Sequence, residues 1–194
     1  STSPVLMDRA VLDRQSFEPE RFTADSSIVV EHLRLGATEF VAAHWETDEA
    51  DFKEALAGSL KKGEIPESWN SWEGMATVSV AVPLGAPLET GTLYCFLPLG
   101  AEGKAPFAGY INANFYTKMD RRSVDTSIQL NEFFMRMAAW LSCQLIGFLV
   151  KSKLEHAPGA VVSLLCWDGD YVGQIGHSMG DDGKGILSRP FLPT

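Results

Sequence analysis

Cysteine is scarce in this chain. Its 194 residues include three cysteines, and no two of them form a C-x-x-C pair. This scarcity excludes a scaffold held together by disulfides and a zinc site built on paired cysteines. It favours a reducing, intracellular environment, and we therefore expect a cytoplasmic location.

Positive charge is also in short supply. The chain has 16 Lys and Arg residues against 25 Asp and Glu residues, a formal net charge of −9. General nucleic-acid binding is disfavoured because phosphate contacts require clustered cations. The four histidines contain no i, i+4 pair, so we expect no metal site.

The sequence shows no secretory leader, since no basic segment precedes an apolar one near its start. It begins at Ser1 rather than at Met, which suggests an excised or processed piece of a longer protein. The most apolar stretch, 133–150, contains Arg136, and polar residues such as Ser142 and Gln144 lie at its centre. These features predict a buried helix rather than a membrane span, and no membrane partner is expected.

Aromatic residues are plentiful, with 11 Phe, 5 Trp and 4 Tyr, and they can anchor a folded core. Short apolar runs bounded by Gly and Pro predict strands at 27–35, 38–45, 75–83, 91–97 and 109–116, with a strand fragment at 5–7. A helix is predicted after Thr47, which would be its N-cap, and Gly63 would end it.

The long apolar segment predicts a second helix over 128–155, with Thr126 and Gln129 as a capping box at its start. Residues 161–167 fit either a strand or a short buried helix. We expect an α+β fold in which a mixed or antiparallel sheet packs against the long helix. Cys95 and Cys143 lie inside apolar elements and are predicted to be core residues.

Two glycine-rich motifs near the C-terminus resemble catalytic signatures without completing them. Residues 176–180 match G-x-S-x-G around Ser178, but poor helix formers follow this motif and no histidine comes after it. Gly183 and Lys184 lack the other residues of a P-loop. No catalytic residue is predicted, and a serine hydrolase using Ser178 is kept as a minor alternative.

The most informative block is 91–141. It contains FLPL at 96–99, GYINANF at 109–115 and DRR at 120–122, followed by a helix that opens with Asn131. This block resembles the junction between the ATPase domain and the middle domain in GHKL-type ATPases of the sacsin-like branch, which are relatives of the ninety-kilodalton heat-shock chaperone.

The resemblance implies a division of the chain into two segments. Residues 1–98 would correspond to the end of a GHKL ATPase domain, and 99–194 to a middle or transducer-like domain. The superfamily's ordered set of ATP-binding boxes, a helix with a Glu and an Asn followed by D-x-G-x-G and a glycine-rich lid, is not found in this chain. The chain alone is therefore expected to hold no cofactor, whereas the complete protein would use ATP and Mg²⁺.

The resemblance also implies a role for the basic turn that contains Lys118, Arg121 and Arg122. In this family the transducer domain supplies a cation to the terminal phosphate of the nucleotide. The other interpretation is a solvated turn whose charges are balanced by Asp120 and Asp125.

We thus expect a non-catalytic transducing or regulatory segment of a larger ATPase, with the remaining domains of the same protein as its partners. The alternative is a protein-interaction module without nucleotide chemistry. In that case Trp69 and Trp72, on the predicted loop 66–74, would be exposed and would contact a protein partner.

Overall fold

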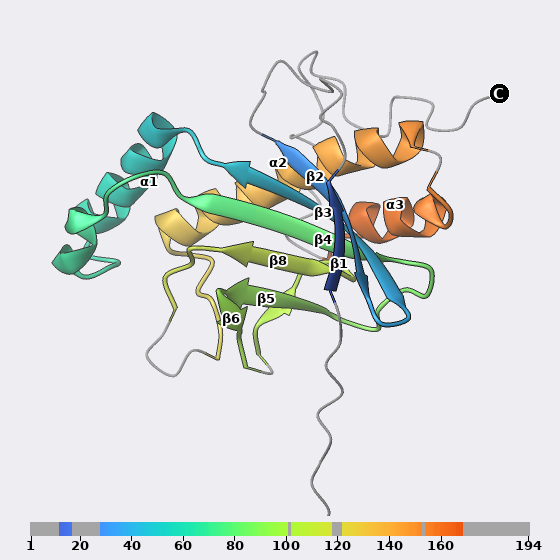
Figure 1. The fold of residues 1–194 in the computed structure, drawn as a ribbon. Coiled ribbons are helices and arrows are strands. Elements are labelled where there is room, and N and C mark those ends of the chain that lie inside the picture. Colours follow the sequence, from blue (N-terminus) through green and yellow to red (C-terminus); the bar gives the residue numbers. More distant parts are fainter. Residues whose placement is uncertain (1–11, 17–27, 101, 118–121, 153, 169–194) are drawn as a thin grey trace, which may run out of the picture.

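The computed structural model describes residues 12–16, 28–100, 102–117, 122–152 and 154–168. Its α+β fold confirms the predicted class: one mixed sheet packs against a long, largely buried helix (Figure 1). The strands are β1 (Leu12–Ser16), β2 (Val29–Leu35), β3 (Thr38–Glu46), β4 (Thr77–Leu84), β5 (Gly91–Cys95), β6 (Leu97–Pro98), β7 (Lys104–Ala105) and β8 (Tyr110–Ala113). The helices are α1 (Glu49–Lys61), α2 (Gln129–Lys151) and α3 (Ala157–Leu165), with a short 3-10 helix, η1 (Glu67–Ser71).

The strand order of the sheet is β1-β2-β3-β4-β8-β5-β6, and β7 pairs with β5. Its neighbouring strands run antiparallel except for β5 and β8, which are parallel. Strands from both sides of residue 98 therefore share one sheet, while the division into segments 1–98 and 99–194 stays a prediction.

Helices α2 and α3 pack on one face of the sheet, chiefly against β4, and α1 lies beside α2 (Figure 1). Alternate residues of each strand point toward these helices. Trp45 of β3 contacts Trp140 of α2, with ring centroids 4.9 Å apart. The fully buried side chains of this layer include Val41, Val78, Val80, Ile111, Phe134, Leu141 and Leu145.

Helix α1 forms as predicted, but its N-cap lies one residue later than expected. The Asp48 carboxylate accepts hydrogen bonds from the backbone N–H groups of Ala50 and Asp51, at 2.8 and 3.3 Å. Thr47 is fully buried, and its hydroxyl oxygen accepts from the backbone N–H of Ala76. Asp48 caps the helix because the hydroxyl of Thr47 is already used to join the chain to the segment before β4.

The predicted capping box at the start of α2 is wrong. The N-cap residue is Ile128, and no side chain of its own segment caps the helix. Instead, Glu64 Oε2 accepts from the backbone N–H of Gln129 at 2.8 Å, and Ser59 Oγ accepts from that of Leu130 at 2.8 Å. Tertiary packing places the end of α1 against α2, and this arrangement satisfies the free N–H groups.

Several element bounds differ from those predicted. Helix α2 ends at Lys151, and residues 161–165 of the open region 161–167 belong to helix α3, which decides for a helix there. The predicted strand 91–97 turns back at Phe96, whose φ of 62° places it in the left-handed region. Strands β1 and β7 and the helix η1 were not predicted, and the strand fragment predicted at 5–7 lies outside the described residues.

Within the described part of the chain, α2 alone is long and apolar enough to cross a membrane. It is mostly buried inside the fold, so it serves as the core helix, as the sequence predicts.

Candidate functional site

The loop between β8 and α2 contains the predicted basic residues. We call residues 117–124 the basic loop. An antiparallel bridge between Thr117 and Val124 closes it. Arg122 is exposed on this loop, whereas Lys118 and Arg121 lie outside the described residues. The bridge keeps the two ends of the loop together.

A buried asparagine fixes the base of the basic loop. Asn131, fully buried in the first turn of α2, accepts from the backbone N–H of Tyr116 through Oδ1, at 2.9 Å. Its Nδ2 donates to the backbone oxygens of Tyr116, at 2.8 Å, and of Asp125, at 2.9 Å. One side chain thus binds the residues that precede and follow the loop. We call this arrangement the Asn131 clamp.

The basic loop also packs closely on the turn between β6 and β7. The backbone N–H of Gly103 donates to the oxygen of Gly100 at 2.8 Å, which forms the turn. A Cβ atom on Gly100 would lie 3.2 Å from Arg122 Cα. This spacing is close for a side chain, so glycine here permits the backbone of Arg122 to approach.

An aromatic pocket of about 330 Å³ opens beside Thr117, at the base of the basic loop. Trp69 and Trp72 line it and stack on each other, with centroids 5.5 Å apart. Trp72 also meets Phe52 edge-on, and Trp69 meets Tyr116 edge-on. The two tryptophans are half-buried against the core, so the expectation that they are exposed is wrong. They are held there because their rings pack against Phe52 and Tyr116.

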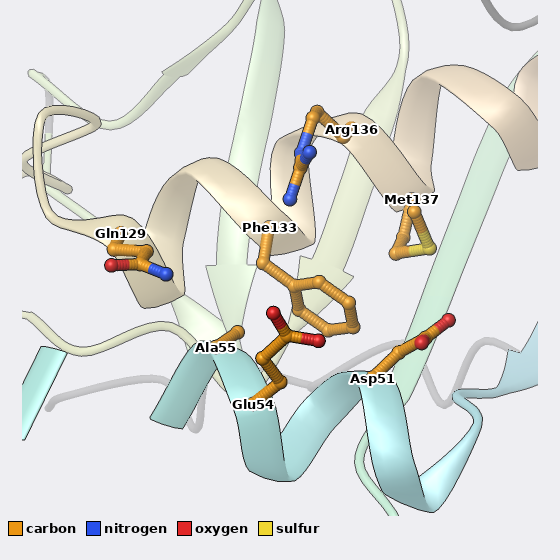
Figure 2. Close-up of a pocket in the computed structure, with 7 residues that line it drawn as sticks. All are labelled: Asp51, Glu54, Ala55, Gln129, Phe133, Arg136 and Met137. Carbon is orange, nitrogen blue, oxygen red and sulfur yellow. The ribbon is translucent and has the colours of Figure 1, made fainter. Parts of the chain in front are cut away.

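A groove of about 310 Å³ runs between α1 and α2 (Figure 2). Asp51 and Glu54 line it from α1 and Arg136 lines it from α2, while the ring of Phe133 lies between the two helices. Asp51, Glu54 and Arg136 are all solvent-exposed. Water screens their charges, so the groove lacks the desolvated polar groups of a built binding site.

The described residues contain no group of three or more metal-ligating side chains. Cys143 is buried, and burial raises the pKa of its thiol to about 12, which keeps it protonated and unreactive. Cys95 is half-buried and its thiol donates to the backbone oxygen of Phe115 at 3.3 Å. Ser178 and its glycine-rich motif lie outside the described residues.

Sequence reasoning noted Asn131 as the opening of a helix without assigning it a role. The available signal was a polar residue in the first turn of the helix, followed at helical spacing by the apolar residues Phe134, Met135 and Ala138. Such a residue is buried only when its hydrogen bonds are satisfied, and in this fold the ends of the basic loop satisfy them.

Comparison with known proteins adds no family to these observations. The chain matches no protein-family model, and no curated protein or solved structure is significantly similar to it.

Proposed function

We propose that this chain is a transducing and regulatory segment of a larger GHKL-type ATPase, non-catalytic toward ATP itself, in which the basic loop meets the terminal phosphate of ATP. Residues 99–194 would form the transducer-like part. The observation that carries the proposal is the Asn131 clamp, which ties both ends of the basic loop to the first turn of α2.

The clamp favours a positioned loop over a merely solvated one. A surface turn satisfies its backbone groups with water and needs no buried partner. Here three hydrogen bonds from a fully buried side chain hold Tyr116 and Asp125 in place. Holding a charged group before its ligand arrives lowers the entropy cost of contact, which is what a phosphate-sensing cation requires.

The proposal includes the partners and cofactors of the complete protein. The remaining domains of the same protein would supply the adenine and Mg²⁺ sites, and the whole would be cytoplasmic. Arg121 and Arg122 suit phosphate better than Lys118 because the guanidinium fork can meet two phosphate oxygens at once.

The test uses the full-length protein with Arg121→Ala and Arg122→Ala made singly. Turnover should fall by about a hundredfold or more, while nucleotide affinity should change much less, because the cation meets the phosphate mainly in the reacting state. Arg34→Ala is the matched control. Arg34 is an exposed arginine on β2 paired with Glu39 at 2.7 Å, and water screens a surface pair of this kind.

Turnover within twofold of wild type for both loop variants would contradict the phosphate-sensing role. The alternative proposal, a protein-interaction module without nucleotide chemistry, would then be preferred. The aromatic pocket beside the basic loop, lined by Trp69 and Trp72, is the surface that such a module would use.

A further inference from the structure

A row of hydrogen-bonded polar side chains crosses the sheet on the face opposite to α2 and α3. His44 of β3 lies directly opposite Ser79 of β4, and its Nδ1 is 2.9 Å from Ser79 Oγ. His44 Nε2 is 3.1 Å from Oε2 of Glu31, on β2. Three strands therefore bring a hydroxyl, an imidazole and a carboxylate together in one hydrogen-bonded row.

The donor and acceptor roles in this row of hydrogen bonds follow from the carboxylate. Ionised Glu31 can only accept, so the proton of neutral His44 is on Nε2, which donates to Glu31. The Nδ1 lone pair of His44 is then the acceptor for the Ser79 hydroxyl. Glu31 is buried, with 4% of its side chain exposed, while His44 is 38% exposed. This is the order of a nucleophile, a base and an orienting acid.

The two reactive members of the row line a pocket of about 420 Å³. Its other walls are mainly apolar and aromatic: Leu33, Leu35, Phe40, Ala42, Ala81, Tyr94, Phe96 and Tyr110. Burial and the nearby Tyr94 raise the pKa of Tyr110, which keeps this wall uncharged near neutral pH. An apolar hollow with a few convergent polar groups is the typical form of a small-molecule site.

A hydrogen-bond donor also lies beside the serine. Asn112 of β8 is the direct cross-strand partner of Ser79 and lines the same pocket. Its Oδ1 accepts from the backbone N–H of Phe96 at 3.1 Å, which fixes the amide. The Asn112 Nδ2 group, for which the described part of the chain offers no acceptor, remains to stabilise a developing oxyanion.

We propose that Ser79, His44 and Glu31 form a hydrolytic site for esters or thioesters with an apolar acyl chain. Ser79 Oγ attacks the acyl carbon and forms a bond to it, while the hydroxyl proton passes to His44 Nδ1. The bond to the leaving oxygen or sulfur breaks, and that atom takes the proton from His44.

Water completes the reaction. It gives a proton to His44 and adds to the acyl carbon, the bond to Ser79 Oγ breaks, and Ser79 recovers its proton as the carboxylic acid departs. Glu31 acts as a positioning residue that holds the His44 tautomer. This site is independent of the proposed role of the basic loop and does not involve Ser178.

The test treats the 194-residue chain with a fluorophosphonate probe and locates the adduct by peptide mass spectrometry. We expect the adduct on Ser79 and its loss in Ser79→Ala. Hydrolysis of p-nitrophenyl octanoate should exceed that of the acetate, and Ser79→Ala or His44→Gln should lower it by at least about a hundredfold. The control Ser71→Ala, at an exposed serine of η1, should leave both unchanged.

Glu31→Gln should lower kcat while leaving KM within about twofold, because it disturbs the base and not the acyl pocket. Circular dichroism checks the folding of each variant. An adduct on Ser178, no adduct in the folded wild type, or labelling that a folded His44→Gln variant leaves unchanged would each overturn the proposal. If His44→Gln fails to fold, the mapped adduct together with Ser79→Ala decides the question.

Discussion

Asn131 is the residue that holds the base of the basic loop in place. Its side chain is fully buried and bonds to backbone atoms of Tyr116 and Asp125. Substituting it with alanine would remove all three hydrogen bonds, each of which contributes about 0.5–1.5 kcal/mol net. We predict that Asn131→Ala lowers the free energy of unfolding by about 2–3 kcal/mol, measured by urea denaturation with tryptophan fluorescence.

The control for this prediction is Asn70→Ala, at an exposed position of η1, which should change stability by less than about 0.5 kcal/mol. Equal effects from the two substitutions would show that Asn131 holds nothing in place.

Glu64 gives the fold a pH dependence. The backbone N–H of Gln129, then the hydroxyl of Ser59 and the ammonium of Lys62, lower the pKa of the Glu64 carboxyl below its ordinary value of 4.5. A carboxyl whose pKa is lowered in the folded state adds stability at pH values above its unfolded-state pKa. This stability is lost as the pH falls through the folded-state pKa.

We therefore predict that Glu64→Gln destabilises the protein near neutral pH and that its difference from wild type shrinks as the solution is acidified below about pH 4. Urea denaturation at several pH values measures this difference. The exposed Glu73 supplies the control, Glu73→Gln, which should track wild type throughout. A difference for Glu64→Gln that stays constant from neutral to acid would show that its charge has no part in capping α2.

The sequence located a helix cap closely only where the capping residue is a near neighbour in the chain. The acidic first turn of α1 located that helix to within one residue of its true cap, since Asp48 acts on its immediate neighbours. The caps of α2 come from Ser59 and Glu64, which are 71 and 65 residues away from the groups that they bind. Local patterns contain no information about such partners.

At the scale of elements, close packing around β5 makes one glycine indispensable. A Cβ atom on Gly91 would lie 1.9 Å from the backbone oxygen of Phe107 and 2.5 Å from that of Gly109. The Gly109 oxygen accepts from the backbone N–H of Thr92 on β5, and the Phe107 oxygen accepts from that of Gly109, so neither atom can give way cheaply. Gly91→Ala is expected to lower the free energy of unfolding by at least about 2 kcal/mol.

Gly147 in α2 offers the matched comparison, because a Cβ atom there would meet nothing within 4 Å. Gly147→Ala should raise stability by about 0.5–1 kcal/mol, since alanine favours the helix. Thermal denaturation of both variants decides the point, and a Gly91→Ala protein as stable as wild type would refute the close packing.

Apolar periodicity predicted α1, α2 and the β2–β3 hairpin well, since each buries one face against the core. Apolar periodicity did not predict the break between β5 and β6, because the apolar run 91–97 continues through the turn at Phe96. That residue adopts a positive φ, and its backbone N–H donates to Asn112 Oδ1 from a neighbouring strand. The contact is tertiary, so the sequence of the strand itself could not reveal it.

For the whole molecule, the proposed role implies that the isolated chain binds ATP weakly if at all. The chain lacks the superfamily's ordered set of ATP-binding boxes, and a D-x-G-x-G match at 181–185 together with a few loop cations supplies only part of a nucleotide site. Isothermal titration of the 194-residue chain with ATP and Mg²⁺ should give no binding at micromolar affinity. A Kd in the micromolar range or tighter would contradict the assignment of this chain as a segment without its own nucleotide site.

The candidate sites were predictable to different degrees. The basic turn stood out because its residues are contiguous in the sequence. The row of Glu31, His44 and Ser79 did not, because three separate strands contribute to it. Only the register of the sheet shows that these side chains meet, and register is fixed by pairing between distant segments.

The first turn of α2 is joined both to the end of α1 and to the base of the basic loop. Helix α2 has 23 residues, which corresponds to a rod of roughly 35 Å. A displacement of the basic loop would therefore tilt α2 about its first turn. A tilt of about 10° would carry the opposite end of the rod, where α3 packs, through roughly 6 Å.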